Sequence, residues 1–174
     1  MEHSTRDPVS RPETSSNIPI GNLSGQTIQS ISYALKPLLA DVFTLFVKTK
    51  NFHWHMSGPH FRDYHNLLDE QTSELLSMMD DIAERARQIG GSSIRSIGDI
   101  VRHRCLGDNE EEMLSSRDML AELCSDNQQI TRSLRAVHEI CSRHGDVATS
   151  SLIENWIHEA ERRTWFLSEV QREG

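Results

Sequence analysis

The sequence predicts an all-α protein, a bundle of four long helices with a short extra helix between the second and the third. Glycine (9 of 174 residues) and proline (5) are sparse and aromatic residues make up only 6%, which favours long helices over many strands and turns. Apolar residues recur at helical spacing in four segments, and one connection between these segments is much longer than the others. The length suits one domain with a sizeable core.

Residues 1–22 are predicted to form a flexible N-terminal tail, followed by the bundle domain at residues 23–174. The tail carries three prolines, several hydroxyl residues and little apolar content. It lacks the apolar run of a secretory signal. We also expect no membrane span, because no apolar run in the chain approaches the roughly 18 residues that a span needs.

The first helix is expected from about residue 25 to 53, with Pro37 kinking or interrupting it. A turn at residues 57–59 leads into a second helix, which extends to about residue 89. The Gly90-Gly91 pair then ends it.

The long connection at residues 92–115 contains IGDIVRHRC, which we expect to form the short helix. Ser115 and Asp118 have the spacing of a capping box and begin the third long helix. This helix runs to about residue 144, where Gly145 ends it, and the fourth helix spans about residues 147–172.

Charge and cysteine content narrow the class of protein. The net charge of −8 argues against a general affinity for nucleic acid, which usually requires a basic patch. Cys105, Cys124 and Cys141 are odd in number and show no CxxC spacing. We interpret them as reduced cytosolic thiols, neither a disulfide framework nor a zinc site.

The second long helix has three distinct faces when it is drawn at about 100° per residue. One face is an apolar core stripe. His65, Asp69, Asp80 and Glu84 share a second sector, about 100° wide, together with Leu76 and Ala83. The third face is acidic and contains Asp63, Glu70, Glu74 and Asp81.

The second sector contains two pairs at i,i+4 spacing, His65 with Asp69 and Asp80 with Glu84. The pairs are separated by about 16 Å along the helix axis, so one ion cannot bridge them within one chain. An antiparallel contact between this helix and its own copy would bring the first pair of one chain to the second pair of the other. His53, just before the turn, is a further candidate ligand. This arrangement predicts an obligatory dimer.

Imidazole and carboxylate donors without thiolate suit iron or manganese better than copper(I), with zinc as an alternative. The same pattern also fits an ordinary solvated helix surface, and Trp54 fits either a core anchor or an electron donor beside a redox metal. The residues alone leave these alternatives open.

The run KNFHWHMSGPHFRDYHNLLDE, followed by DDIAERARQIGG, resembles the signature of the Dps family, the DNA-binding proteins from starved cells, a branch of the ferritin-like superfamily. The resemblance covers residues 25–172 and is most specific at 50–91. It implies a hollow dodecamer of ferritin-like subunits, with His53, His65 and Asp69 of one subunit and Asp80 and Glu84 of another binding iron.

The implied activity is that of a ferroxidase, an enzyme that oxidises Fe(II) to Fe(III), typically with hydrogen peroxide or otherwise with O2, and stores the ferric mineral. Trp54 matches the family's tryptophan beside this centre. The acidic face described above is a candidate for mineral nucleation. No histidine has a Glu three positions before it, which disfavours the di-iron site of conventional ferritins.

The chain departs from the DNA-binding members of the family in its tail. Arg6 and Arg11 are outweighed by Glu2, Asp7 and Glu13, so DNA binding is expected to be weak or absent. Two other functions stay open: a nucleoid-compacting protein with secondary iron chemistry, and a helical interaction module without metal. A location in the bacterial cytoplasm or nucleoid suits both the ferroxidase and the nucleoid-compacting protein.

Overall fold

The computed structural model describes residues 22–172, so the predicted tail lies outside the described residues apart from Asn22. The described part contains five helices and no strand. They are α1 Gly25–His55, α2 Phe61–Gln88, α3 Ile97–His103, α4 Ser116–Arg143 and α5 Val147–Glu169. The predicted fold class is therefore confirmed, including the short helix in the long connection.

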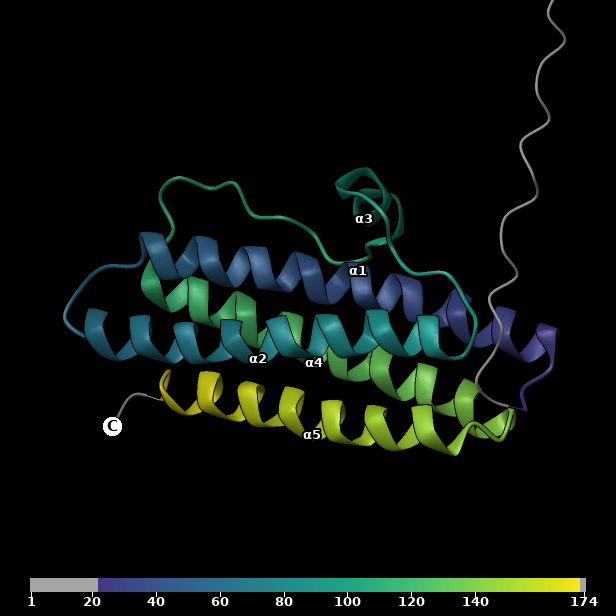
Figure 1. The fold of residues 1–174 in the computed structure, drawn as a ribbon. Coiled ribbons are helices and arrows are strands. Elements are labelled where there is room, and N and C mark those ends of the chain that lie inside the picture. Colours follow the sequence, from purple (N-terminus) through teal and green to yellow (C-terminus); the bar gives the residue numbers. More distant parts are fainter. Residues whose placement is uncertain (1–21, 173–174) are drawn as a thin grey trace, which may run out of the picture.

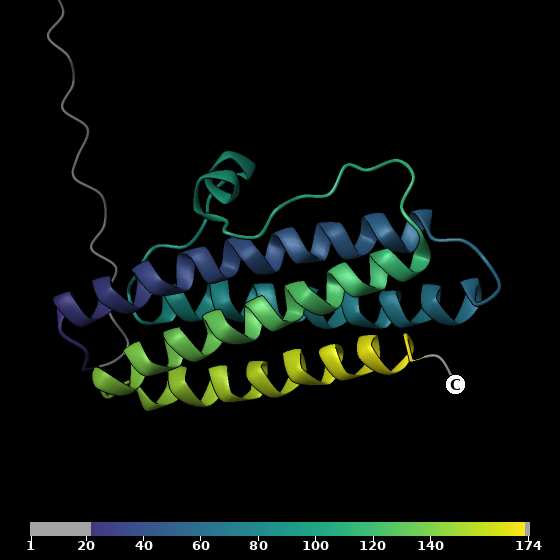
Figure 2. The ribbon, with the colours of Figure 1, turned by 180° about the vertical axis from the view of Figure 1, so that it is seen from behind.

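The four long helices form one bundle (Figure 1), in which α1 packs against α2 and α4, and α5 packs against α4 and α2. The short helix α3 lies on the outer side of α1, and the rest of the connection runs along α1 to the start of α4 (Figure 2). This connection spans the length of the bundle because α2 ends at the opposite end from the one where α4 begins.

Local sequence signals explain the helix boundaries. Ser24, Ser96, Ser115 and Asp146 each accept a hydrogen bond from a backbone amide three residues later, which caps the N-termini of α1, α3, α4 and α5. The capping pair at Ser115 differs from a full capping box, because the Asp118 carboxylate accepts from the Ser115 hydroxyl at 2.6 Å. Glycines with positive φ follow α2 and α4: Gly90 at 94° and Gly145 at 69°.

Pro37 does not interrupt α1, although an interruption was one of the two effects expected from the sequence. The helix continues from Gly25 to His55 with Pro37 inside it. A proline removes one backbone hydrogen bond, but Leu35, Leu38 and Leu39 around it are all buried. Their packing against the other helices holds α1 together across the missing bond.

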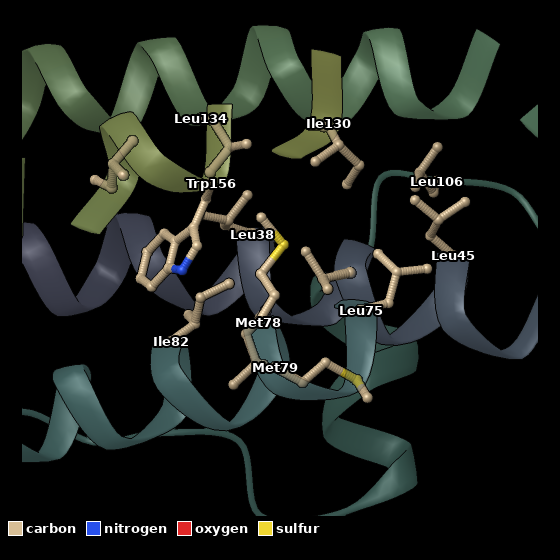
Figure 3. Packing of buried hydrophobic residues seen from close by; sticks show 14 of the residues in the cluster. Leu38, Leu45, Leu75, Met78, Met79, Ile82, Leu106, Ile130, Leu134 and Trp156 are labelled. Carbon is tan, nitrogen blue, oxygen red and sulfur yellow. The ribbon is translucent and has the colours of Figure 1, made fainter. Parts of the chain in front are cut away.

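The core lies between all four long helices (Figure 3). Each long helix contributes side chains to it: Leu38 and Leu45 from α1, Met78 and Ile82 from α2, Ile130 and Leu134 from α4, and Trp156 from α5. The apolar stripe predicted on α2 is buried from Leu68 onward. At the beginning of α2, however, Phe61 is 44% exposed, and its ring contacts that of His65 at a tilt of 36°.

By length and composition alone, α1 is also long and apolar enough to cross a membrane, with a mean hydropathy of 1.4 over 18 residues. The expectation that no stretch of the chain comes close to a membrane span was therefore wrong for this helix. Ile31, Leu35, Val42 and Leu45 are fully or almost fully buried within the bundle. Their burial accounts for the apolar character of α1 as that of a core helix.

Candidate metal centre

The junction between α1 and α2 brings His53, His65 and Asp69 together. His53 lies in the last turns of α1 and is buried, while His65 and Asp69 lie one turn apart near the start of α2. The two imidazole rings stack, with centroids 3.7 Å apart and planes inclined by 22°. His53 Nε2 lies 3.9 Å from Asp69 Oδ1.

The hydrogen bonds of the two imidazoles define which nitrogen of each ring can bind a cation. Nδ1 of His53 lies 2.9 Å from the carbonyl oxygen of His65, and Nδ1 of His65 lies 3.0 Å from that of His53. A carbonyl oxygen only accepts, so each Nδ1 carries the proton. In the neutral ring, Nε2 then keeps its lone pair for a metal ion, as in many metal-binding histidines.

Asp69 already has a cationic partner. Lys50 Nζ donates to Asp69 Oδ1 at 2.7 Å. The hydrogen bond and the charge of Lys50 hold the pKa of this carboxyl below its usual value, with smaller contributions from His53 and His65. Asp69 is therefore a carboxylate at neutral pH, with its side chain 60% exposed.

Asp80 and Glu84 are exposed and lie farther along α2, three to four turns from Asp69. Among the residues that the structure describes, no group of three or more His, Cys, Asp or Glu side chains could hold a metal ion within one chain. A single subunit therefore presents two separate parts of the ligand set that the sequence predicts.

Asp80 borders an open groove of about 820 Å³ between α1, α2 and the segment around α3. Leu76 and Ala83, which share a sector of α2 with Asp80, also line it, and Leu76 is 57% exposed. The groove is otherwise mainly apolar, lined by Leu39, Phe43, Met79, Ile94, Ile97 and Ile100. Within one chain, nothing in the described residues fills this groove.

The acidic face predicted on α2 is only partly free. Asp63, Glu70 and Asp81 are exposed. Glu74 is half-buried and forms ion pairs with Arg162 and Arg163 of α5, the latter at 3.3 Å. Glu74 therefore ties α2 to α5 and is a weaker candidate for contact with mineral than the other three.

The remaining candidates of the histidine run differ in their surroundings. Trp54 is 65% exposed, so it is not a core anchor within the chain. His55 and His60 are exposed, and His55 Nδ1 bonds only to the Asn51 carbonyl of its own helix. The structure thus keeps these two histidines apart from the His53–His65 pair in their bonding.

Two cations occupy the polar part of the bundle interior. Lys48 donates to Glu122 at 2.7 Å and to Asp126 at 2.8 Å, and its side chain is 4% exposed. Arg163, 1% exposed, bonds to Asn127 and Glu74. Because these interior carboxylates already bind side-chain cations, they do not provide the free carboxylate cluster of an intrachain di-iron site.

Lys50 was not among the candidate site residues expected from the sequence, although its position contained a signal. Lys50 precedes His53 by three residues, which places both on the same side of α1. The ion pairs that Lys48 and Arg163 form had no such signal, because the partners of each residue come from other helices.

Comparisons with known proteins identify the fold family of this chain. Residues 33–173 match the ferritin-like domain family. An uncharacterized low temperature-induced protein of Nostoc sp. is 33% identical over 83% of this chain and 82% of its own length. The DNA protection during starvation protein 1 of Deinococcus radiodurans is 26% identical over 85% of this chain and 72% of its own length. The structure of Dps from Thermosynechococcus elongatus superimposes with a TM-score of 0.82 at 26% identity, covering 86% of this chain and 94% of that one.

Proposed function

The chain belongs to the ferritin-like family, in its Dps branch, and from this premise we propose that it is a ferroxidase mini-ferritin. It oxidises Fe(II) to Fe(III) at a site shared between two subunits and stores the ferric product inside a hollow dodecamer. The observation that carries the proposal is the half-site at His53, His65 and Asp69. In both imidazoles Nδ1 donates its proton to a carbonyl oxygen, which leaves the lone pair of Nε2 for a metal ion.

The second half of the site comes from Asp80 and Glu84 of another copy. These carboxylates lie on α2 as His65 and Asp69 do, but about 16 Å farther along the axis. When two α2 helices pack antiparallel about a two-fold axis, each His65–Asp69 pair meets an Asp80–Glu84 pair, and two identical sites form.

The groove beside Asp80 supports this dimer. Its apolar lining, with the exposed Leu76 at its margin, lies on the face of α2 that the two-fold contact would bury. Burying apolar surface favours association. The alternative interpretation, an ordinary solvated acidic surface, does not explain an apolar groove beside these carboxylates.

The donor set suits iron as the substrate. Carboxylate oxygens and imidazole nitrogens bind Fe(II), and carboxylates stabilise the harder Fe(III). Two Fe(II) ions together supply the two electrons that convert one hydrogen peroxide and two protons into two water molecules. This paired delivery releases no hydroxyl radical and removes both Fe(II) and peroxide, so it would protect DNA from oxidative damage. Molecular oxygen is the alternative oxidant.

Other residues have supporting roles in this proposal. Trp54, exposed and adjacent to His53 in the sequence, is a candidate electron donor beside the centre. Asp63, Glu70 and Asp81 are candidates for mineral nucleation on the face that would line the cavity, and Glu74 contributes less because of its arginine partners.

The relatives' name concerns DNA protection, and we place this protein in the bacterial cytoplasm or nucleoid. Direct DNA binding is expected to be weak or absent at physiological salt, because the chain has a net charge of −8. A gel shift that persists above about 150 mM salt would contradict this expectation and favour nucleoid compaction as the main function.

The mass of the native particle tests the assembly. Twelve copies of the 19.9 kDa chain give roughly 240 kDa. A stable monomer would rule out both the cage and the shared site.

Co-assembly of two inactive variants tests the shared site more directly. Subunits with His65→Ala and subunits with Asp80→Ala should each assemble without rapid Fe(II) oxidation. A mixed dimer contains one doubly altered site and one intact site. Random mixing should therefore restore about a quarter of the wild-type rate. No recovery in mixed particles of confirmed composition would show that the residues do not act across the interface.

A further inference from the structure

Lys50 occupies the carboxylate oxygen of Asp69 that lies nearest to the imidazole of His53. Asp69 Oδ1 accepts from Lys50 Nζ at 2.7 Å, and the same oxygen lies 3.9 Å from His53 Nε2. A cation bound between His53 Nε2 and this oxygen would compete directly with the ammonium group. Lys50 and a metal ion therefore cannot both use Oδ1 at full strength.

The position of this ion pair indicates that it is not primarily a fold element. The Asp69 side chain is 60% exposed and that of Lys50 is 25% exposed, and such surface pairs contribute little to stability. Lys48, two residues earlier, contrasts with it: its side chain is 4% exposed and it forms ion pairs with two carboxylates of α4. The two neighbouring lysines thus differ in burial, and only Lys48 is expected to contribute substantially to the stability of the fold.

We propose that Lys50 is a positioning residue that acts as a tethered counter-ion of the candidate iron site. It holds Asp69 beside His53 while the site is empty, and it leaves Oδ1 when a divalent cation enters. The inference rests on the proposed function, because it requires His53 and Asp69 to share a metal ion.

As a consequence, the charge of Lys50 reduces the affinity of the site for divalent cations. A positive charge a few ångströms from a divalent ion opposes binding even in a high-dielectric surface site. Lys50 also offsets one of the negative charges that Asp69 and the partner subunit's Asp80 and Glu84 bring together. A moderate affinity suits a site that passes its ions on to a mineral store.

The test measures binding of Co2+, used as a substitute for Fe(II) under anaerobic conditions, to the assembled full-length protein by calorimetry and by the Co2+ absorption spectrum. Lys50→Met removes the charge and retains the side-chain length. It should tighten Co2+ binding about tenfold with an unchanged spectrum. Lys50→Arg keeps the charge and should bind as the wild type does. Lys36→Met, a half-buried position on the same helix, is the control for the overall change in charge.

An Asp80→Asn variant identifies which part of the isotherm belongs to the shared site. If Lys50→Met binds Co2+ at that site with wild-type or weaker affinity, Lys50 is not a competing counter-ion and the inference is wrong. If the wild type itself shows no Co2+ binding that depends on Asp80, the proposed function fails instead. The two failures are therefore distinguishable.

Discussion

His53 and His65 orient each other through reciprocal hydrogen bonds, in which Nδ1 of each ring donates to the main-chain carbonyl of the other residue. The pair joins the end of α1 to the beginning of α2 across the turn at residues 57–59. Since the two rings also stack at 3.7 Å, neither can rotate without disturbing the other. The candidate half-site is thus pre-organised before any ion arrives.

Replacing His65 with alanine should lower rapid Fe(II) oxidation by at least about tenfold, because the change removes one candidate ligand and the ring that stacks on His53. The rate is measured by the absorbance of ferric product after mixing with Fe(II) and peroxide. His60→Ala is the matched control, since His60 lies in the same histidine-rich run but is exposed. Equal rates for both variants would mean that His65 is not part of the centre.

Cys141 should resist alkylation in the native protein. Burial, and secondarily the nearby Asp146, raises the pKa of its thiol to about 11. At pH 8 only about one thiol in a thousand would be ionised, and the thiolate is the reactive form. In a Cys105→Ser/Cys124→Ser variant, iodoacetamide should therefore label Cys141 only after unfolding. Mass spectrometry detects the label.

The control for this experiment is the Cys124→Ser/Cys141→Ser variant, which retains only Cys105. Cys105 is exposed in the chain and should react without denaturant. Labelling of native Cys141 at the rate of Cys105 would show that the interior of the bundle opens readily around α4.

Local signals allowed most of the fold to be predicted from the sequence. Serine caps and glycines with positive φ define the ends of the helices, and such signals act over a few residues. The sequence did not show that α1 would continue through Pro37, because the packing around this proline depends on the other helices. The same limit applies to Glu74, whose arginine partners lie on α5, far away in the sequence.

The relative positions of the candidate ligands on α2 were predictable for a related reason. His65, Asp69, Asp80 and Glu84 all lie on one helix, so their relative positions follow from helical geometry alone. The reciprocal bonds of His53 and His65 depend on the turn between two helices, and the groove beside Asp80 depends on α3. The periodicity of the sequence predicts neither the reciprocal hydrogen bonds nor the groove.

Gly91 should not tolerate a side chain, because α1 passes directly beside it. A Cβ at this position would lie 1.7 Å from Ser32 Oγ, 2.6 Å from Ser32 Cβ and 3.0 Å from the Ala86 carbonyl oxygen. Gly91→Ala should therefore lower the free energy of unfolding by about 1–3 kcal/mol, as overpacking does. Thermal unfolding at a fixed protein concentration measures the loss.

A double-mutant cycle assigns this cost to the contact with Ser32. Ser32→Gly costs about 1 kcal/mol by itself as a glycine in a helix, but it removes both atoms that approach closest to the new Cβ. Gly91→Ala should then be markedly less destabilising in the Ser32→Gly background. Additive losses would assign the cost to the Ala86 carbonyl or to the backbone.

Lys48→Met should destabilise the protein by about 3–5 kcal/mol at pH 7, since it leaves the buried Asp126 and the half-buried Glu122 without their cation. Burial alone would lower the pKa of Lys48, but its hydrogen bonds to Asp126 and Glu122 outweigh burial and raise that pKa above its usual 10.5. The wild-type contribution of Lys48 is therefore present throughout neutral pH and is lost only as the pH rises past that value.

The pH dependence of this variant separates lost charge from lost packing. Burial raises the pKa of Asp126, with Glu122 and Asp41 adding to the effect of burial and Lys48 opposing it. A carboxyl with a raised pKa in the folded state favours folding at low pH and loses that contribution as the pH rises. Without Lys48, this dependence should become steeper, so the difference in melting temperature between wild type and variant should be smaller at pH 5 than at pH 7. The same difference at both pH values, measured at equal protein concentration, would assign the cost to packing of the lysine side chain.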